Sequence, residues 1–510
     1  MRGVRRDLDQ PSPGHPGGCP TSPASGGRGK TRSPGAIRIR STVLPTVLTV
    51  ALLAGCAGPE DDKPALDIPG GWKAEGPAGT TWPETGWWRS FGSSQLDGLI
   101  RTAQQNNQDI GAAVARVLQA DAQARIAGAP LLPSVGAAGD ASHSVSPERA
   151  SSFGTGSSRT ISDQFSAELS ASYEIDLWGK NRAALQSAQA SALASRYDRD
   201  TVALTVTSST ATTYVQVLEF QDRLAIARDN LANAQQVLNV VLAQESAGAA
   251  SALDVAQQRT VVAQQKAAIP PLEQQRQQTE TALALLLGEP PERLSLQRQS
   301  LDDLEIPVVA AGLPSSLLDR RPDIQNADAQ LLAARFNAKE AKAQLFPSIQ
   351  LTGQGGVQSA ALGTLFNSAN TLYSLAASLT QPIFEGGALR GAVQLTEAQY
   401  QELGQTYVKT VLAAFGDVEN ALIATRQSGL AYQAQQEVVA QAREAFRLSD
   451  AQYRAGAVDL LTVLNAQQSY FSARDQLVQA KSNRLQAAVA LYKALGGGWS
   501  VSSVKAAAGS

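Results

Sequence analysis

The second half of this chain repeats the first half at an almost constant offset, and this duplication limits its possible folds more than any single motif does. Residues 109–134 share identical residues with residues 323–348, each pair 214 positions apart. Residues 247–288 match residues 455–496 at an offset of 208 and need no gap. The units of solenoids and propellers are much shorter, with periods of about 20–50 residues. The sequence therefore predicts a large unit that is present twice, with approximate internal symmetry.

A basic stretch, an apolar run and a cysteine follow one another near the start of the chain. Arginine and lysine residues between Arg28 and Arg40 precede the apolar residues 42–53, and L53-A-G-C56 matches the lipobox of bacterial lipoproteins. The run is too short to cross a membrane as a helix, so we interpret residues 1–55 as a signal peptide. The sequence predicts a lipid on Cys56. By likeness to other lipoproteins, the absence of Asp after Cys56 favours the outer membrane.

Charge and composition argue against several classes of function. Residues 1–55 hold eight of the 43 Lys and Arg residues but only two of the 45 Asp and Glu residues, so the remainder is acidic. Nucleic acid is disfavoured as a partner, because phosphate binding needs a concentrated positive surface. Beyond residue 55 the chain has one cysteine, Cys56, and one histidine, His143. One histidine cannot supply a His/Cys metal site. We expect no metal, no cofactor and no enzymatic activity.

Two very long helices and their return helices are predicted in equivalent parts of the two copies. Residues 181–246 contain neither Gly nor Pro and are rich in good helix formers. At 1.5 Å per residue they form a rod of roughly 100 Å, and residues 389–455 form its counterpart. Residues 252–288 and 460–495 are expected to return antiparallel after tight turns, with coiled-coil-like packing. The pair Pro270-Pro271 predicts a kink or a restart in the first return helix.

A shorter helix and an extended segment precede the first rod. Residues 58–72 are rich in Pro and Gly, which predicts an extended segment on the surface. Ser93 or Ser94 is expected to cap a helix that continues to about Ala127, because the apolar residues after the cap follow a helical spacing.

Two stretches between the helices have the alternation of β-strands. Apolar residues occupy every second position in residues 165–175 and most such positions in residues 373–383. Their partner strands are expected at about residues 133–145 and 347–360. Strands of about ten residues with one apolar and one polar face are typical of a transmembrane barrel. Because four strands cannot close a barrel around a pore, several chains are expected to assemble one.

Five motifs in the right order resemble the TolC/OprM family of outer-membrane efflux channels. They are the lipobox, W87-W-R-S-F91, Y173-E-I-D-L-W-G-K180, Q381-P-I-F-E-G-G387, and Y453-R-A-G-A457 with V463-L-N-A466. The chain is most similar to the lipoprotein branch, the NodT-type outer-membrane subunit of pumps of the resistance–nodulation–division (RND) type. This resemblance implies a mostly α-helical fold with membrane β-structure. A homotrimer would form a long α-helical barrel topped by a 12-stranded β-barrel, four strands per chain.

The repeat and the resemblance together predict the order of domains. Each copy is expected to hold a helix, two barrel strands and a long helical hairpin. The predicted divisions are 1–55 (signal peptide), 56–95 (lipidated extended segment), 96–288 (first repeat), 289–320 (equatorial connector), 321–496 (second repeat) and 497–510 (tail).

The resemblance also implies a passive function in transport. The trimer would be an outer-membrane conduit, lipid-anchored and extending into the periplasm, that opens at its periplasmic tip and exports small toxic compounds. An inner-membrane RND-type pump would drive export through a periplasmic adaptor, or membrane fusion protein. Two alternatives stay open from the residues: an exit duct for protein or lipo-oligosaccharide, and a lipid-anchored periplasmic coiled-coil scaffold.

The turns of the two hairpins are the candidate functional positions. Adaptor docking is expected at Ala247, Gly248, Ala249, Ala455, Gly456 and Ala457. By resemblance to the family, a hydrogen bond between Tyr453 and Asp254 would act as a reversible latch. Thr462 and Asn465 occupy the positions of the family's two entrance aspartates, which leaves Asp459 to form a smaller acidic ring that attracts cations.

Overall fold

The computed structural model describes residues 63–74, 82–146 and 160–501. All of them belong to one compact unit, Asp61–Ser510. The signal peptide and the lipid attachment at Cys56, both predicted above, lie outside the described residues and stay predictions.

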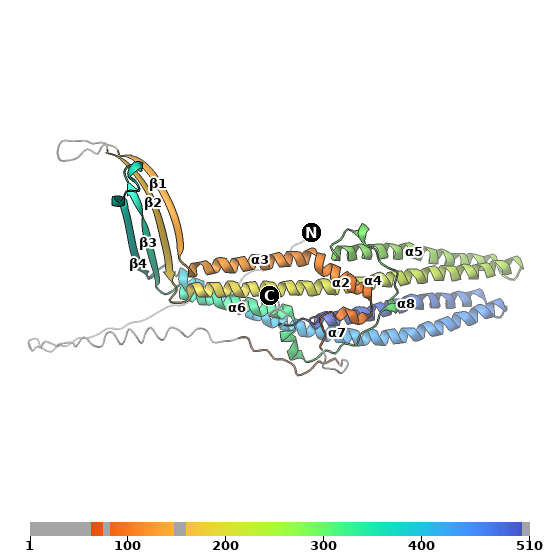
Figure 1. Ribbon diagram of the computed structural model, residues 1–510. Helices are drawn as coiled ribbons and strands as arrows, with labels where there is room; N and C mark the ends of the chain where they lie inside the picture. The colour runs from red at the N-terminus through yellow and green to blue at the C-terminus, as the bar shows by residue number, and fades with distance from the viewer. Residues whose placement is uncertain (1–62, 75–81, 147–159, 502–510) are drawn as a thin grey trace, which may run out of the picture. The chain divides into compact units, whose positions relative to one another are not determined.

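Four long helices form two antiparallel hairpins, as predicted (Figure 1). They are α4 (Lys180–Ser246), α5 (Ala252–Leu286), α7 (Ala388–Arg454) and α8 (Leu460–Ala494). Helices α4 and α7 have 67 residues each and are therefore about 100 Å long. Among the described residues, no helix combines the length and apolar character that crossing a membrane requires.

Of the kink or restart predicted at Pro270 and Pro271, the restart is wrong, because α5 continues through both residues as one helix. Each proline removes one backbone N–H from the helical ladder. The hydrogen bonds of the turns on either side and the packing of α5 along α4 keep the element intact, since tertiary packing supplies most of a helix's stability.

The helix expected from Ser93 or Ser94 to about Ala127 is two helices, α2 (Ser94–Asn106) and α3 (Gln108–Gly128). Ser93 caps α2 and its side chain accepts a hydrogen bond from the Leu96 N–H. Asn107 separates the two helices, because its backbone is extended (φ −65°, ψ 130°) and its side-chain oxygen caps α3. The prediction missed this break because the apolar spacing continues through it.

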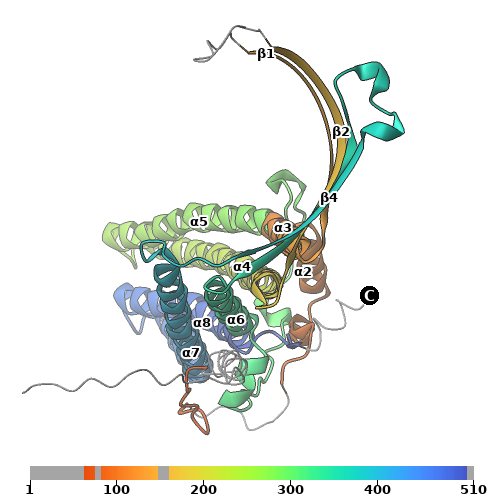
Figure 2. The same ribbon diagram turned by 90° about the vertical axis from the view of Figure 1, so that its left-hand side faces the viewer.

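The four predicted strands form one antiparallel sheet in the order β1-β2-β3-β4, which Figure 2 shows as a curved surface. Their bounds are Ser134–Ser146, Thr160–Ile175, Ser348–Ser359 and Thr371–Thr380. In the register of β1 and β2, Ala137 opposes Leu169 on one face, whereas Gly136 opposes Ser170 on the other. The sheet therefore has an apolar and a polar face. Strands β1 and β4 are its edges.

The largest buried core lies where α2, the ends of α5 and α8, and the middle of α4 and α7 meet. Trp87 of the W87-W-R-S-F91 motif stacks on Tyr492 of α8, with ring centroids 4.7 Å apart. Phe91 and Tyr214 are fully buried in the same core. This motif therefore joins the start of the first repeat to the end of the second. The connector 289–320 crosses the outside of this region with three short 3-10 helices.

Both repeats end in the same junction beside this core. In the first, the Asn107 side chain donates to the Leu286 carbonyl at 2.9 Å, which ties the end of α5 to the start of α3. In the second, the Arg321 guanidinium donates to the Ala494 carbonyl at 3.2 Å and ties α8 to α6 (Pro322–Ala343).

A glycine with positive φ follows the return helix in both junctions, Gly288 at 70° and Gly496 at 85°. A Cβ atom on either one would collide with a backbone carbonyl, that of Asn106 or of Arg320. The duplication therefore extends to contacts between elements.

We expect Gly496→Ala to lower the free energy of unfolding by about 2 kcal/mol or more, because Ala disfavours positive φ and its Cβ would collide with the Arg320 carbonyl. Gly111→Ala is the matched control, since Gly111 lies inside α3 with open space around it and should gain up to about 1 kcal/mol. Thermal unfolding followed by circular dichroism measures both. Equal free energies of unfolding for the two variants would show that alanine at position 496 causes no strain at the junction.

Candidate functional site

The turns of the two hairpins have almost identical backbones. The last helical carbonyls are followed by Ala247 and Ala455, both with φ −84° and ψ −3°, and then by Gly248 and Gly456 with φ 75° and 73°. In the first turn the Ala249 N–H donates to the Gln244 carbonyl at 2.8 Å. The Ala457 N–H repeats this bond to Gln452 at 2.9 Å. Each turn is thus a Schellman motif, which needs glycine at the left-handed position.

The surface of both turns consists of small exposed residues. Ala247, Gly248 and Ala249 of the first turn and the equivalent Ala455, Gly456 and Ala457 of the second are all exposed. No heavy atom lies within contact distance of a Cβ built at Gly248 or Gly456. A helical hairpin of another protein could therefore approach the backbone of these turns closely. Adaptor docking at these six residues stays a prediction.

Each return helix begins with a hydroxyl and a carboxylate three residues apart, and the order of the two groups is reversed between α5 and α8. Ser251 caps α5, and its hydroxyl donates to the Asp254 carboxylate at 2.7 Å. Asp459 caps α8, and its carboxylate accepts from the Thr462 hydroxyl at 2.6 Å and the Thr462 N–H at 2.9 Å. The role of Thr462 escaped the sequence prediction, although an acidic or hydroxyl residue followed by its partner three positions later is a known capping signal.

Asp459 is exposed and charged at neutral pH. The hydrogen bonds from Thr462 lower the pKa of the Asp459 carboxyl below its ordinary value. Asn465 and Thr462 are exposed on the first turns of the same helix. All three thus lie near the tip, and Asp459 is the negative charge among them.

Tyr453 lies in an apolar cluster that joins the two hairpins near their tips. The cluster of buried residues, called the tip cluster below, consists of Val237, Val241, Val255, Tyr453, Leu460 and Val463. It includes residues from α4, α5, α7 and α8. Tyr453 is only 7% exposed, so its ring acts mainly by packing.

The hydrogen bond predicted between Tyr453 and Asp254 is absent from this chain. The Tyr453 hydroxyl is buried and has no hydrogen-bond partner among the described residues. The Asp254 carboxylate instead accepts from the Ser251 N–H at 2.8 Å and from the Ser251 hydroxyl. Burial raises the pKa of the Tyr453 phenol, and the negative charge of Asp254 raises it further. The two side chains interact electrostatically, and the Asp254 carboxylate forms part of the cap of α5.

Two buried glutamines near the tips were missed by sequence reasoning. Gln258 of α5 and Gln467 of α8 are both fully buried. The Gln258 side-chain N–H donates to the Ala234 carbonyl of α4 at 2.8 Å. Among the described residues, the Gln258 oxygen and both amide atoms of Gln467 have no hydrogen-bond partner. Gln467 follows Val463 by one helical turn and therefore lies on the apolar stripe of α8. A polar residue on that stripe was the sequence signal that could have revealed its burial.

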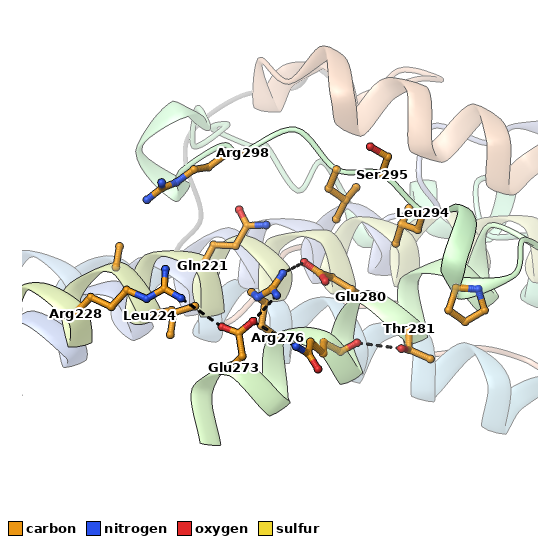
Figure 3. A pocket seen from close by; sticks show the side chains of 14 residues that line it. Gln221, Leu224, Arg228, Glu273, Arg276, Glu280, Thr281, Leu294, Ser295 and Arg298 are labelled. Carbon is orange, nitrogen blue, oxygen red and sulfur yellow. Dashed lines mark hydrogen bonds and ion pairs between the residues drawn. The ribbon is translucent and has the colours of Figure 1, made fainter. Parts of the chain in front are cut away.

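A charged groove of about 650 Å³ lies farther from the tips, between α4, α5 and residues 291–298 (Figure 3). Arg276 donates to Glu273 and Glu280 at 2.6 Å each, and Arg228 of α4 lies 3.7 Å from Glu273. The hydrogen bond from Arg276 lowers the pKa of the Glu273 carboxyl. Both pairs of Arg276 lie within α5, whereas the Arg228–Glu273 pair links α5 to α4.

Comparison with known proteins agrees with the duplicated fold. The family model described as "Outer membrane efflux protein" matches residues 99–289 and 313–497, one segment in each repeat. The chain is 45% identical over 459 residues to the pyoverdine export outer membrane protein OpmQ of Pseudomonas putida, covering 89% of this chain and 97% of that protein. It is 32% identical over 467 residues to the toluene efflux pump outer membrane protein TtgC of Pseudomonas putida, covering 90% and 96%. The solved structure of the outer-membrane channel OprN matches with a TM-score of 0.81 and 26% identity, covering 87% of this chain and 99% of that one.

Proposed function

The chain belongs to the outer membrane efflux protein family, and we propose that three copies of it form the exit duct of a tripartite export system. The observation that carries this proposal is a two-faced four-stranded sheet continuous with rods of about 100 Å in one chain. A sheet with an apolar and a polar face suits a boundary between lipid and water.

The unpaired edge strands of the sheet are an argument for the proposed trimer. Strands β1 and β4 each have one side without a neighbouring strand. Unpaired backbone groups are costly in lipid, so each β4 would pair with β1 of the next copy. Three copies then close a 12-stranded barrel. In this arrangement residues 96–288 and 321–496 supply equivalent parts of the wall, and residues 289–320 form an equatorial connector around it.

We assign the lipid anchor to Cys56 on the lipobox alone. We expect labelled palmitate to be incorporated into the protein and to disappear in Cys56→Ala. Membrane fractionation then locates the variant that lacks the lipid. If Cys56→Ala is still secreted, its barrel should keep it in the outer membrane. A Cys19→Ala control should keep the label. Labelling that survives Cys56→Ala would contradict this assignment.

Two partners are proposed, one that binds the exposed turns and one that supplies the energy that a passive duct needs. A periplasmic adaptor of the membrane fusion type would bind the turns at Gly248 and Gly456. An inner-membrane pump of the RND type would then supply the energy. The small residues of the turns let two helical hairpins pack closely, as small residues do between other helices.

The tip cluster is the proposed gate, with Tyr453 acting by packing and Asp254 by capping α5. We expect Tyr453→Ala to raise the resting single-channel conductance in planar bilayers, because truncating a buried aromatic residue costs about 3–5 kcal/mol of packing. Tyr453→Phe should lower it slightly, because it removes a buried hydroxyl that has no hydrogen-bond partner among the described residues. Asp459→Asn should weaken cation preference without opening the pore, and conductance that is identical in all three variants would remove the gate from these residues.

The proposed cargo rests on the sequence identity of this chain to two relatives. The chain is 45% identical to OpmQ but 32% identical to TtgC, over similar lengths. We therefore propose export of a secreted compound of the pyoverdine kind in preference to a solvent such as toluene.

Replacement of each relative in Pseudomonas putida tests this choice. The chain should restore pyoverdine to the medium of a strain that lacks OpmQ. It should restore toluene tolerance poorly or not at all in a strain that lacks TtgC. The opposite pattern would overturn the proposed cargo but would keep the proposed duct.

A further inference from the structure

A polar side chain interrupts the apolar stripe by which α8 joins the tip cluster. Leu460 and Val463 belong to that cluster, and Phe471 lies two turns beyond Val463. Gln467 lies between Val463 and Phe471 with no exposed surface at all. A fully buried amide normally has hydrogen-bond partners. Its position on this stripe therefore calls for an explanation.

Neither the nitrogen nor the oxygen of the Gln467 amide has a partner within the described part of the chain. The Tyr453 hydroxyl, in the same region, is also buried without a partner. Each such group costs its full desolvation free energy, because water would satisfy it in a more open arrangement. The closely packed tips are therefore less stable than their apolar contacts alone would make them.

Gln258 provides a comparison within the same molecule. It is also fully buried, it lies at a similar distance from its turn, and its N–H donates to the Ala234 carbonyl at 2.8 Å. This bond ties α5 to α4. The amide of Gln467 does not tie α8 to any neighbour in this way. Residue type and burial are equal, and the amide oxygen lacks a partner among the described residues in both, so the difference lies in the bond of the Gln258 nitrogen.

We propose that Gln467 is a gate-positioning residue, whose buried and unpartnered amide keeps the packed tips close in free energy to a separated, open arrangement. The inference rests on the proposed channel function. A gate opens only if the two states differ by a small free energy, which a partner can outweigh. An apolar tip cluster alone would favour the packed state strongly. The amide offsets part of that preference, because it gains hydrogen bonds to water when the helices separate.

The test uses two substitutions that should act in opposite directions. Gln467→Leu keeps the size of the side chain and removes the unpartnered amide, so it should raise the melting temperature and lower the open probability in planar bilayers roughly tenfold. Gln467→Glu places a charge at the buried position and should raise the open probability at neutral pH. Acidic pH should close this variant again, because the protonated carboxyl is neutral.

Controls separate the inference from general effects on the fold. Gln258→Leu removes a bond that is made, so it should not raise the melting temperature. Wild-type channels at the same pH values control for every other effect of pH on the tips.

The outcomes distinguish the two proposals. A Gln467→Leu variant that is less stable than wild type, or equally open, would overturn the role of Gln467. Wild-type protein that is folded and inserted but does not conduct would overturn the channel itself.

Discussion

The repeated junction between a helix end and a helix start is the contact on which the rest of the structure depends. At each junction a glycine with positive φ lets the chain after α5 or α8 lie against a backbone carbonyl. The side chain that precedes α3 or α6 donates to the carbonyl of the last residue of α5 or α8. The two long hairpins can lie in parallel only if both junctions fix the same geometry. A larger residue at Gly288 or Gly496 would separate the elements there, and the effect would reach the tips along rigid rods of about 100 Å.

The two copies keep this geometry with different chemistry. Asn107 occupies the first junction, whereas Arg321 occupies the second and also pairs with Asp323 and Asp417. Burial opposes the charge of Arg321, but the two carboxylates outweigh it and its pKa is raised. The caps of α5 and α8 have likewise exchanged carboxylate and hydroxyl. Backbone geometry is thus preserved more strictly than the side chains that stabilise it, because each helix end needs a partner but accepts several chemical groups.

The tips combine strong packing with incomplete hydrogen bonding. Apolar residues from four helices meet in the tip cluster, and the Tyr453 hydroxyl and the Gln467 amide are buried without partners beside it. In a static support such groups would be a defect. In a duct that closes and reopens, we propose that they keep the two states within a few kcal/mol of each other. Tyr453 packs in the tip cluster through its ring, although its phenol had suggested a hydrogen bond to Asp254.

Local periodicity and the positions of Gly and Pro were enough to predict the helices and strands. The bounds of α4 and α7 agree with the prediction within one residue, and the four strands were found by alternation. The six turn residues were placed correctly at the tips for the same local reason. Four features became apparent only in the folded chain: the break at Asn107, the continuity of α5 through Pro270 and Pro271, the partner of Asp254 and the burial of Gln467. Each of these depends on competition between groups that the fold brings together, and periodicity along the chain carries no information about that competition.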